Sequence, residues 1–214
     1  MPNRYYPVFL DMDGRLAVVV GGGGVAEGKV TGLLEAGARV TVVSPSLTPA
    51  LMSCADDHTV TWFARRYRAG DLAGAWLAVA ATDDPATNIA VAEEAASAGI
   101  LINVVDTPAR CSFIAPAVVR RNDLTIAIST GGKSPAMARK VREEMERLFP
   151  PEYGALLRVA GEVRSALQRE GRRVTADLWQ RALSPEVLDL VRQGRSQEAA
   201  ALLTKSLRPG LVQR

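Results

Sequence analysis

A glycine turn near the amino terminus has the spacing of a site for the pyrophosphate of a dinucleotide. Residues 21–26 read GGGGVA and satisfy the pattern G-x-G-x-x-A. In that pattern the first glycine permits a tight turn, the second lets the backbone approach the phosphates, and the alanine lets a helix pack closely on a strand. The amides that open the helix favour the negative charge. The residues expected to bind the cofactor at this turn are Gly21, Gly23, Gly24 and Val25.

The adenosine ribose of a dinucleotide is usually bound by an acid about 20 residues after the glycines. This chain has Ser44, Pro45 and Ser46 there, so both the acid typical of NAD sites and the arginine typical of NADP sites are absent. Hydroxyl or backbone groups of these residues are expected to serve the ribose. The ribose position alone leaves both cofactors open.

Polar residues also follow two later apolar segments. Thr82, Asp83 and Asp84 either contact the nicotinamide half of a cofactor or cap the next helix. Asp106 stands where a carboxylate would face the substrate beside the nicotinamide. The alternative for Asp106 is to cap the turn at residues 107–108.

A second glycine turn, at residues 129–135, precedes a helix start. Its hydroxyls, paired glycines and lysine favour an anionic group through amides and the helix dipole, or else form a tight, well-capped turn without a ligand. It is not a P-loop, because no glycine stands five residues before Gly132. The residues expected to contact substrate or take part in chemistry at this turn are Ser129, Thr130, Gly131, Gly132, Lys133 and Ser134.

The alternation of apolar segments predicts how these residues are brought together. Residues 16–20 form an unbroken apolar run, typical of a strand buried on both faces. The predicted strands are 6–10, 16–20, 39–43, 60–64, 76–81 and 100–105, and the predicted helices are 25–37, 48–55, a short one near Asp71, and 85–98. This order predicts an α/β fold with a Rossmann-type doubly wound parallel sheet, whose ligands lie at the carboxyl ends of the strands.

From residue 112 the pattern changes. We expect a short helix at 115–121, a strand at 124–128 and a helix that begins near Ser134 and Pro135. Hydrophobic spacing stays helical from residue 151 to the end. The predicted organisation is a nucleotide-binding domain over residues 1–114, a small α+β segment over 115–150 and a C-terminal helical domain over 151–214.

Composition argues against several other functions. The net charge is only +3, with no run of lysines, so no nucleic-acid partner is expected. No apolar stretch approaches the roughly 18 residues that span a bilayer, and the amino terminus lacks a secretory signal pattern. We therefore expect a cytoplasmic protein without a membrane segment. One histidine and two widely spaced cysteines match no metal-ligand spacing, so no bound metal is expected.

Five segments together resemble the precorrin-2 dehydrogenase family, the dehydrogenase and ferrochelatase module of siroheme synthase. They are VGGGGVAEGK at 20–29, ATDD at 81–84, NVVD at 103–106, SFIAP at 112–116 and STGGKSP at 129–135. Their order and spacing agree with the family over residues 5–150. The helical third is similar in length and character.

The resemblance implies oxidation of precorrin-2 to sirohydrochlorin with NAD and, in many members, insertion of ferrous iron as a substrate to give siroheme. It places the family's aspartate, a general base, on Asp106. Thr130 stands where members often have serine and keeps the hydroxyl, so Asp106 and Thr130 are the expected catalytic residues. The residues expected to face the eight carboxylates of the substrate are those of the second glycine turn, with Arg110, Arg120 and Arg121.

The resemblance further implies a homodimer in which residues 115–150 exchange contacts between subunits. The methyltransferase module fused to some members does not follow Arg214, so methylation is expected to come from elsewhere. Two alternative functions remain. One is an NAD-binding regulatory module without catalysis, which would usually keep the acid that binds the ribose. The other is a different small NAD(P)-dependent oxidoreductase. The second would usually show a tyrosine-lysine or histidine pair, which is not apparent here.

Overall fold

The computed structural model describes residues 5–208 and 212–213. Contacts divide the chain into two compact units, Met1–Ala115 and Pro116–Arg214. The first unit contains the predicted parallel sheet, and the second contains a hairpin followed by helices. The predicted fold class is confirmed.

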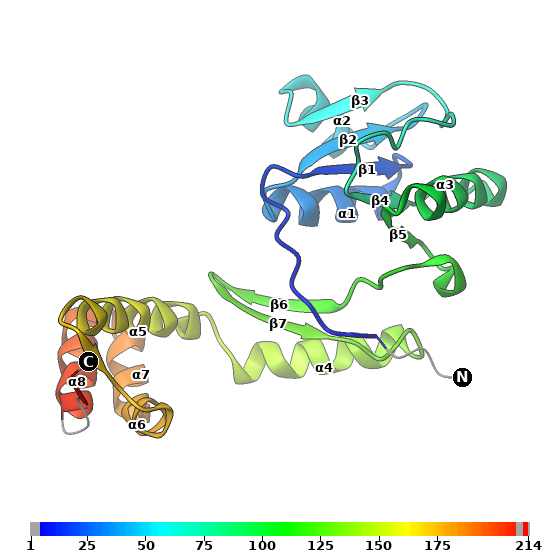
Figure 1. The fold of residues 1–214 in the computed structure, drawn as a ribbon. Helices are drawn as coiled ribbons and strands as arrows, with labels where there is room; N and C mark the ends of the chain where they lie inside the picture. Colours follow the sequence, from blue (N-terminus) through cyan, green and yellow to red (C-terminus); the bar gives the residue numbers. More distant parts are fainter. Residues whose placement is uncertain (1–4, 209–211, 214) are drawn as a thin grey trace. The chain divides into compact units, whose positions relative to one another are not determined.

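A five-stranded parallel sheet in the order β3-β2-β1-β4-β5 forms the centre of the first unit (Figure 1). Its strands are β1 Leu16–Val20, β2 Arg39–Val43, β3 Val60–Phe63, β4 Leu77–Ala80 and β5 Leu101–Val104. Val20 is in register with Val43 and with Ala80, and Ala80 is in register with Val104. The residues that follow these four strands therefore emerge along one edge of the sheet.

Both faces of this sheet are covered, which explains why its strands are apolar without interruption. On one face Val19 and Val42 pack with Val30 of α1 (Gly24–Glu35) and Leu51 of α2 (Pro49–Asp56). On the other face the strands pack against α3 (Pro85–Ala98). The buried side chains on that face include Val18, Val20, Ala78, Val91 and Ala95.

Two predictions for the first unit are wrong. Residues 6–10 are not a strand, because no strand of the sheet pairs with them, and Tyr6 and Phe9 are 86% and 74% exposed. The segment around Asp71 is a series of turns rather than a helix. Gly70 and Gly74 lie at φ +96° and +77°, which a right-handed helix does not accommodate.

The second unit begins with an antiparallel hairpin of β6 (Ala117–Arg121) and β7 (Leu124–Ile128). The helix predicted at 115–121 is therefore wrong. The β-branched pair Val118 and Val119 favours a strand, and Asn122 adopts φ +53°, as a two-residue hairpin turn requires. Helix α4 (Pro135–Leu148) follows, with Ser134 as its cap as predicted.

Four helices complete the second unit: α5 Glu152–Arg169, α6 Ala176–Ala182, α7 Pro185–Arg192 and α8 Ser196–Leu207. Val159, Val187 and Leu203 are fully buried between them. A short pairing of β8 (Arg172–Arg173) with β9 (Val212–Gln213) was not predicted. Across the residues that the structure describes, no helix is both long enough and apolar enough to cross a membrane.

Candidate functional site

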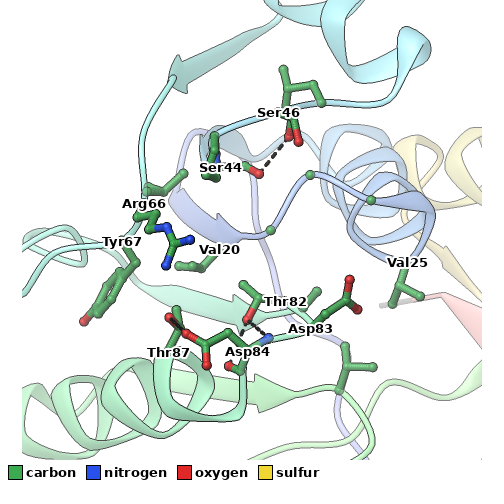
Figure 2. A pocket seen from close by; sticks show the side chains of 18 of the residues that line it. Val20, Val25, Ser44, Ser46, Arg66, Tyr67, Thr82, Asp83, Asp84 and Thr87 are labelled. Carbon is green, nitrogen blue, oxygen red and sulfur yellow. Dashed lines mark hydrogen bonds between the residues drawn. The ribbon is translucent and has the colours of Figure 1, made fainter.

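A cavity of about 900 Å³ opens at the carboxyl edge of the parallel sheet. Its walls come from the segments that follow β1, β2, β3, β4 and β5 (Figure 2). Every residue predicted for the cofactor, together with Asp106, lines it. Those residues are Gly21, Gly23, Gly24, Val25, Ser44, Pro45, Ser46, Thr82, Asp83 and Asp106.

The four glycines after β1 divide into two pairs with different constraints. Gly21 has φ +126°, and a Cβ there would lie 2.2 Å from the carbonyl oxygen of Ala81. A Cβ at Gly22 would lie 2.0 Å from the carbonyl oxygen of Ser46. A Cβ at Gly23 or Gly24 would meet no atom within 4 Å. The first pair is thus required by the packing of the protein, while the second pair leaves open space in the cavity.

Helix α1 begins at this open space. Gly23 is its N-cap and, in a stretch that the structure describes throughout, no side chain accepts a hydrogen bond from the first turn. The positive end of the helix dipole and its first amides therefore face the cavity without a side-chain cap. These features fit the pyrophosphate of a dinucleotide.

The loop after β2, residues 44–46, is the expected ribose-binding part of the cavity and is called the ribose edge. It is hydrogen-bonded internally, and the segment that follows it is hydrogen-bonded to the glycine turn. Thr48 N donates to the Gly22 carbonyl at 2.9 Å, and the buried Ser44 hydroxyl donates to the Ser46 carbonyl at 2.7 Å. Trp62 Nε1 donates to the Ser44 carbonyl at 2.9 Å. The Ser44 hydroxyl proton thus stabilises its own loop, and an oxygen lone pair remains to accept a bond.

At the end of β4 the residues engage mainly with α3. Asp84 is the N-cap of that helix and accepts from Thr87 Oγ1 at 2.6 Å and from Ala86 N at 3.1 Å. These bonds, the one from Thr87 first, lower the pKa of Asp84. Thr82 Oγ1 lies 2.8 Å from Asn88 Oδ1 and accepts from Asp84 N at 3.2 Å. Capping is therefore the role of Asp84, while Thr82 and Asp83 also line the cavity.

Asp106 follows β5 in a left-handed conformation, at φ +57°. Its carboxylate is exposed and, among the residues that the structure describes, makes no hydrogen bond or ion pair. The short helix at Pro108–Arg110 has Thr107 as its N-cap and no side-chain cap bond. The observed bonding thus gives Asp106 no capping role, and its carboxylate is available to a ligand. Cys111 holds the loop beneath it, because Val104 N donates to its Sγ at 3.1 Å.

The residues after β3 were not among those predicted for the site. Arg66, Tyr67 and Thr87 also line the cavity. The signal was available for the first two, since they follow the predicted strand at 60–64 and the carboxyl ends of parallel strands share one edge.

The second glycine turn belongs to the second unit and is held by its own hydroxyls. Thr130 Oγ1 accepts from Ser134 N at 3.3 Å and Ser129 Oγ accepts from Gly131 N at 3.1 Å. Ser134 Oγ accepts from Met137 N at 3.1 Å. Gly131 and Gly132 adopt φ +62° and +78°. These bonds are those of a well-capped helix start, and they leave the exposed side chain of Lys133 available.

Metal ligands do not gather anywhere in the described parts of the chain: no group of three histidine, cysteine, aspartate or glutamate side chains is placed to hold an ion. His58 occupies a turn at φ +62°, and both cysteines are free.

Fold and cavity together define an NAD(P)-binding protein of the Rossmann class. Residues 8–117 match the family model described as "Putative NAD(P)-binding", and residues 121–148 match "Sirohaem biosynthesis protein central". The chain belongs to the precorrin-2 dehydrogenase family, which includes the corresponding module of siroheme synthases.

Curated relatives and a solved structure agree with this assignment. Siroheme synthase 1 of Aeromonas salmonicida (strain A449) is 44% identical over 188 residues, covering 86% of this chain and 40% of that protein. The siroheme synthase of Methylococcus capsulatus (strain ATCC 33009 / NCIMB 11132 / Bath) is 38% identical over 204 residues, covering 94% of this chain and 43% of that protein. This chain thus spans less than half the length of these relatives. The structure of SirC, a precorrin-2 dehydrogenase, superposes with a TM-score of 0.73 at 26% identity, covering 94% of this chain and all of that one.

Proposed function

We propose that this protein oxidises precorrin-2 to sirohydrochlorin with NAD as the hydride acceptor. The observation that carries the proposal is one cavity that joins an uncapped helix start to an unpaired carboxylate, Asp106. The family assignment supplies the substrate class. The names of the similar proteins, siroheme synthase and precorrin-2 dehydrogenase, agree with it.

The chemistry divides between the cofactor and the chain. Bound NAD would supply a nicotinamide that accepts a hydride. The chain would hold the pyrophosphate on the amides at Gly23, Gly24 and Val25, and Asp106 would accept the proton that leaves the substrate as the hydride departs. One hydride and one proton together account for the two-electron oxidation.

The substrate carboxylates require cations. Arg110 and Lys133 are exposed and suited to this role. Arg121 is not, because its Nε donates to the Phe149 carbonyl at 2.8 Å and its Nη2 donates to the Glu146 carbonyl at 3.2 Å. Arg121 is therefore not part of the proposed substrate site. It hydrogen-bonds the hairpin to the end of α4. Thr130 remains a proposed site residue, with its hydroxyl bonded inside the turn: it accepts from Ser134 N and donates to the Ser134 carbonyl at 3.1 Å.

The segment 115–150 is proposed to form a homodimer interface, with 1–114 as the nucleotide-binding domain and 151–214 as the helical domain. Helix α4 is described in full and contains no buried residue, while Met137 and Leu148 are 52% and 61% exposed. In the hairpin Val119 is buried, but most of β7 is only half-buried. A second copy of the segment would cover this apolar surface.

Insertion of ferrous iron into the product is the further step that this proposal admits. Iron would enter as a substrate, with the macrocycle as its ligand set, and Asp106 would accept the two pyrrole protons one after the other and pass each to solvent. The step therefore requires no protein metal centre.

The test is anaerobic incubation of the purified chain with precorrin-2 and NAD, following sirohydrochlorin and NADH absorbance and then adding ferrous iron. We expect turnover by the wild type and a loss of about a hundredfold or more in Asp106→Ala, as for removal of a general base. Asp56→Ala is the matched control, because Asp56 is exposed at the end of α2 and does not line the cavity. Binding of NAD without turnover of precorrin-2 would overturn the proposal and favour a nucleotide-sensing module.

A further inference from the structure

The loop between β3 and β4 brings an arginine into the nucleotide cavity. Arg66 lines the same cavity as the glycine turn and the ribose edge at Ser44. Figure 2 shows its guanidinium directed into the cavity, between Ser44 and Asp84. The cofactor and substrate roles proposed above do not use this cation.

One flank of Arg66 is fixed by an ion pair. Arg65 donates from both terminal nitrogens to the two carboxylate oxygens of Asp71, each at 2.7 Å, and Asp71 Oδ2 also accepts from Arg68 N at 2.8 Å. The bond from Arg65 is the main cause of the lowered pKa of Asp71. The residue before Arg66 is therefore held by a bidentate contact within its own loop.

The other flank is fixed to α3. The Tyr67 hydroxyl donates to Glu94, and the Glu94 carboxylate also accepts from Gly70 N at 2.9 Å and Leu72 N at 3.0 Å. Burial comes first among the causes that raise the pKa of Tyr67, so the phenol stays protonated and donates. With Leu72 fully buried beneath it, the loop presents Arg66 from a fixed backbone.

The guanidinium itself is uncommitted. Within the described residues it has no side-chain hydrogen bond and no ion pair; only the Arg66 carbonyl is used, by Arg65 Nη1. Its charge helps to lower the pKa of Asp84, but that carboxylate is already bonded to Thr87 and Ala86. An exposed cation on a fixed stretch of backbone therefore faces the cavity and is available to an anion.

The ribose edge lacks the group that would exclude such an anion. An acid after β2 binds the 2′-hydroxyl of NAD and repels a 2′-phosphate, whereas an arginine nearby accommodates that phosphate. Here Ser44, Pro45 and Ser46 carry no acid, and the arginine comes from the next strand along the sheet, β3.

We propose that Arg66 determines cofactor specificity by binding the 2′-phosphate, and that the site accepts NADP as well as NAD. This inference rests on the proposed dinucleotide site and sharpens it. The residues after β2 alone leave NAD and NADP both open, and Arg66 adds the cation that they lack.

The test is calorimetric titration of the full chain with NAD, NADP, 5′-AMP and 2′,5′-ADP, for the wild type and for Arg66→Gln. Removing one charged hydrogen-bond partner should weaken NADP and 2′,5′-ADP by about tenfold or more and leave NAD and 5′-AMP within about twofold. Arg68→Gln is the matched control, since Arg68 lies in the same loop but does not line the cavity.

Introducing the missing acid into the ribose edge provides an independent test of the proposal. Ser46 is exposed at the ribose edge, so Ser46→Asp should weaken NADP selectively through repulsion of its 2′-phosphate while NAD still binds. Equal losses of NAD and NADP in Arg66→Gln would assign the arginine to the pyrophosphate or adenine and overturn the inference. So would binding of NAD by the wild type without binding of NADP. A folded chain that binds neither dinucleotide would instead overturn the proposed cofactor site.

Discussion

Two glycine turns in this chain stand before helices, and they differ in whether side chains bond their backbone amides. At residues 21–24 the N-cap of α1 is Gly23, without a capping side chain, and a Cβ at that position would enter empty space. At residues 129–134 the hydroxyls of Ser129, Thr130 and Ser134 accept from the amides of the turn and of α4.

The difference teaches that residue types alone do not make an anion site. Both turns combine glycines with the start of a helix, and the second adds hydroxyls and a lysine that favour an anion further. Those hydroxyls, however, satisfy the amides that an anion would need. A turn poor in side chains leaves its backbone amides free to bind a ligand. In a turn rich in hydroxyls, the side-chain oxygens accept hydrogen bonds from those amides.

The largest effect is expected at Gly21, where the first turn has no freedom. Gly21→Ala combines a φ of +126° with a Cβ 2.2 Å from the Ala81 carbonyl oxygen, so the free energy of unfolding should fall by about 3 kcal/mol or more. Chemical denaturation measures this. Gly14→Ala is the control for positive φ without a clash, because its Cβ would meet nothing within 4 Å, and it should cost about 1 kcal/mol. Equal losses in the two variants would contradict the packing argument.

At Gly23 the same substitution should affect ligand binding rather than folding. The Cβ meets no protein atom, so stability should stay near that of the wild type, while NAD affinity should fall by about tenfold or more as the methyl group excludes the pyrophosphate. Calorimetry and thermal unfolding on one sample separate the two effects. Gly28→Ala, inside α1 and also free of contacts, should leave NAD affinity unchanged. Undiminished NAD binding by Gly23→Ala would show that the phosphates lie elsewhere.

The second turn should show the converse pattern. Ser134→Ala removes the side-chain cap of α4 and should cost about 1 kcal/mol of stability. NAD affinity should not change, because Ser134 belongs to the second unit and the cavity lining lies in the first. A variant as stable as the wild type would show that the hydroxyl is free for a ligand after all, and would remove the contrast between the turns.

The smallest expected effect concerns pH, and it extends the comparison to a carboxylate that is fully bonded. Burial raises the pKa of Glu94, but hydrogen bonds from Tyr67, Gly70 and Leu72 outweigh it, so the net shift is downward. A lowered folded-state pKa gives stability that is present above the unfolded value, 4.5, and is lost as pH falls through the lower folded value. Denaturation midpoints of Glu94→Gln should therefore depend less on pH below about 4.5 than those of the wild type. Parallel profiles would contradict the assignment.

Sequence patterns predicted the sheet well because its strands are buried on both faces. The runs at 16–20 and 39–43 coincide with β1 and β2, and the helix at 85–98 coincides with α3, whose ends are marked by Asp84 at the N-cap and Gly99 at φ +68°. The error at 115–121 arose because a short apolar run fits either a helix turn or a strand, and only the pairing partner decides.

The candidate site was less fully predictable. Ligands of a parallel sheet bind at the carboxyl ends of its strands, and this rule predicted site residues after β1, β2, β4 and β5. All of these predicted residues line the cavity. Arg66 was missed because the same rule was not extended to the residues after the predicted strand at 60–64, which ends at the same edge of the sheet. Which backbone amides the hydroxyls of Ser129 and Thr130 bind depends on the side-chain rotamers. The spacing of residues in the sequence does not determine these rotamers.

The bond from Thr48 N to the Gly22 carbonyl has a consequence for the kinetics of cofactor capture. It joins the loop after β2, which is expected to bind the ribose, to the turn after β1, which is expected to bind the phosphates. The two segments are therefore held together before the nucleotide binds. Little chain entropy is then lost when the nucleotide arrives, and no loop has to close over its adenosine half. Binding of that half should proceed in a single kinetic phase, with a rate that rises linearly with nucleotide concentration and does not reach a plateau.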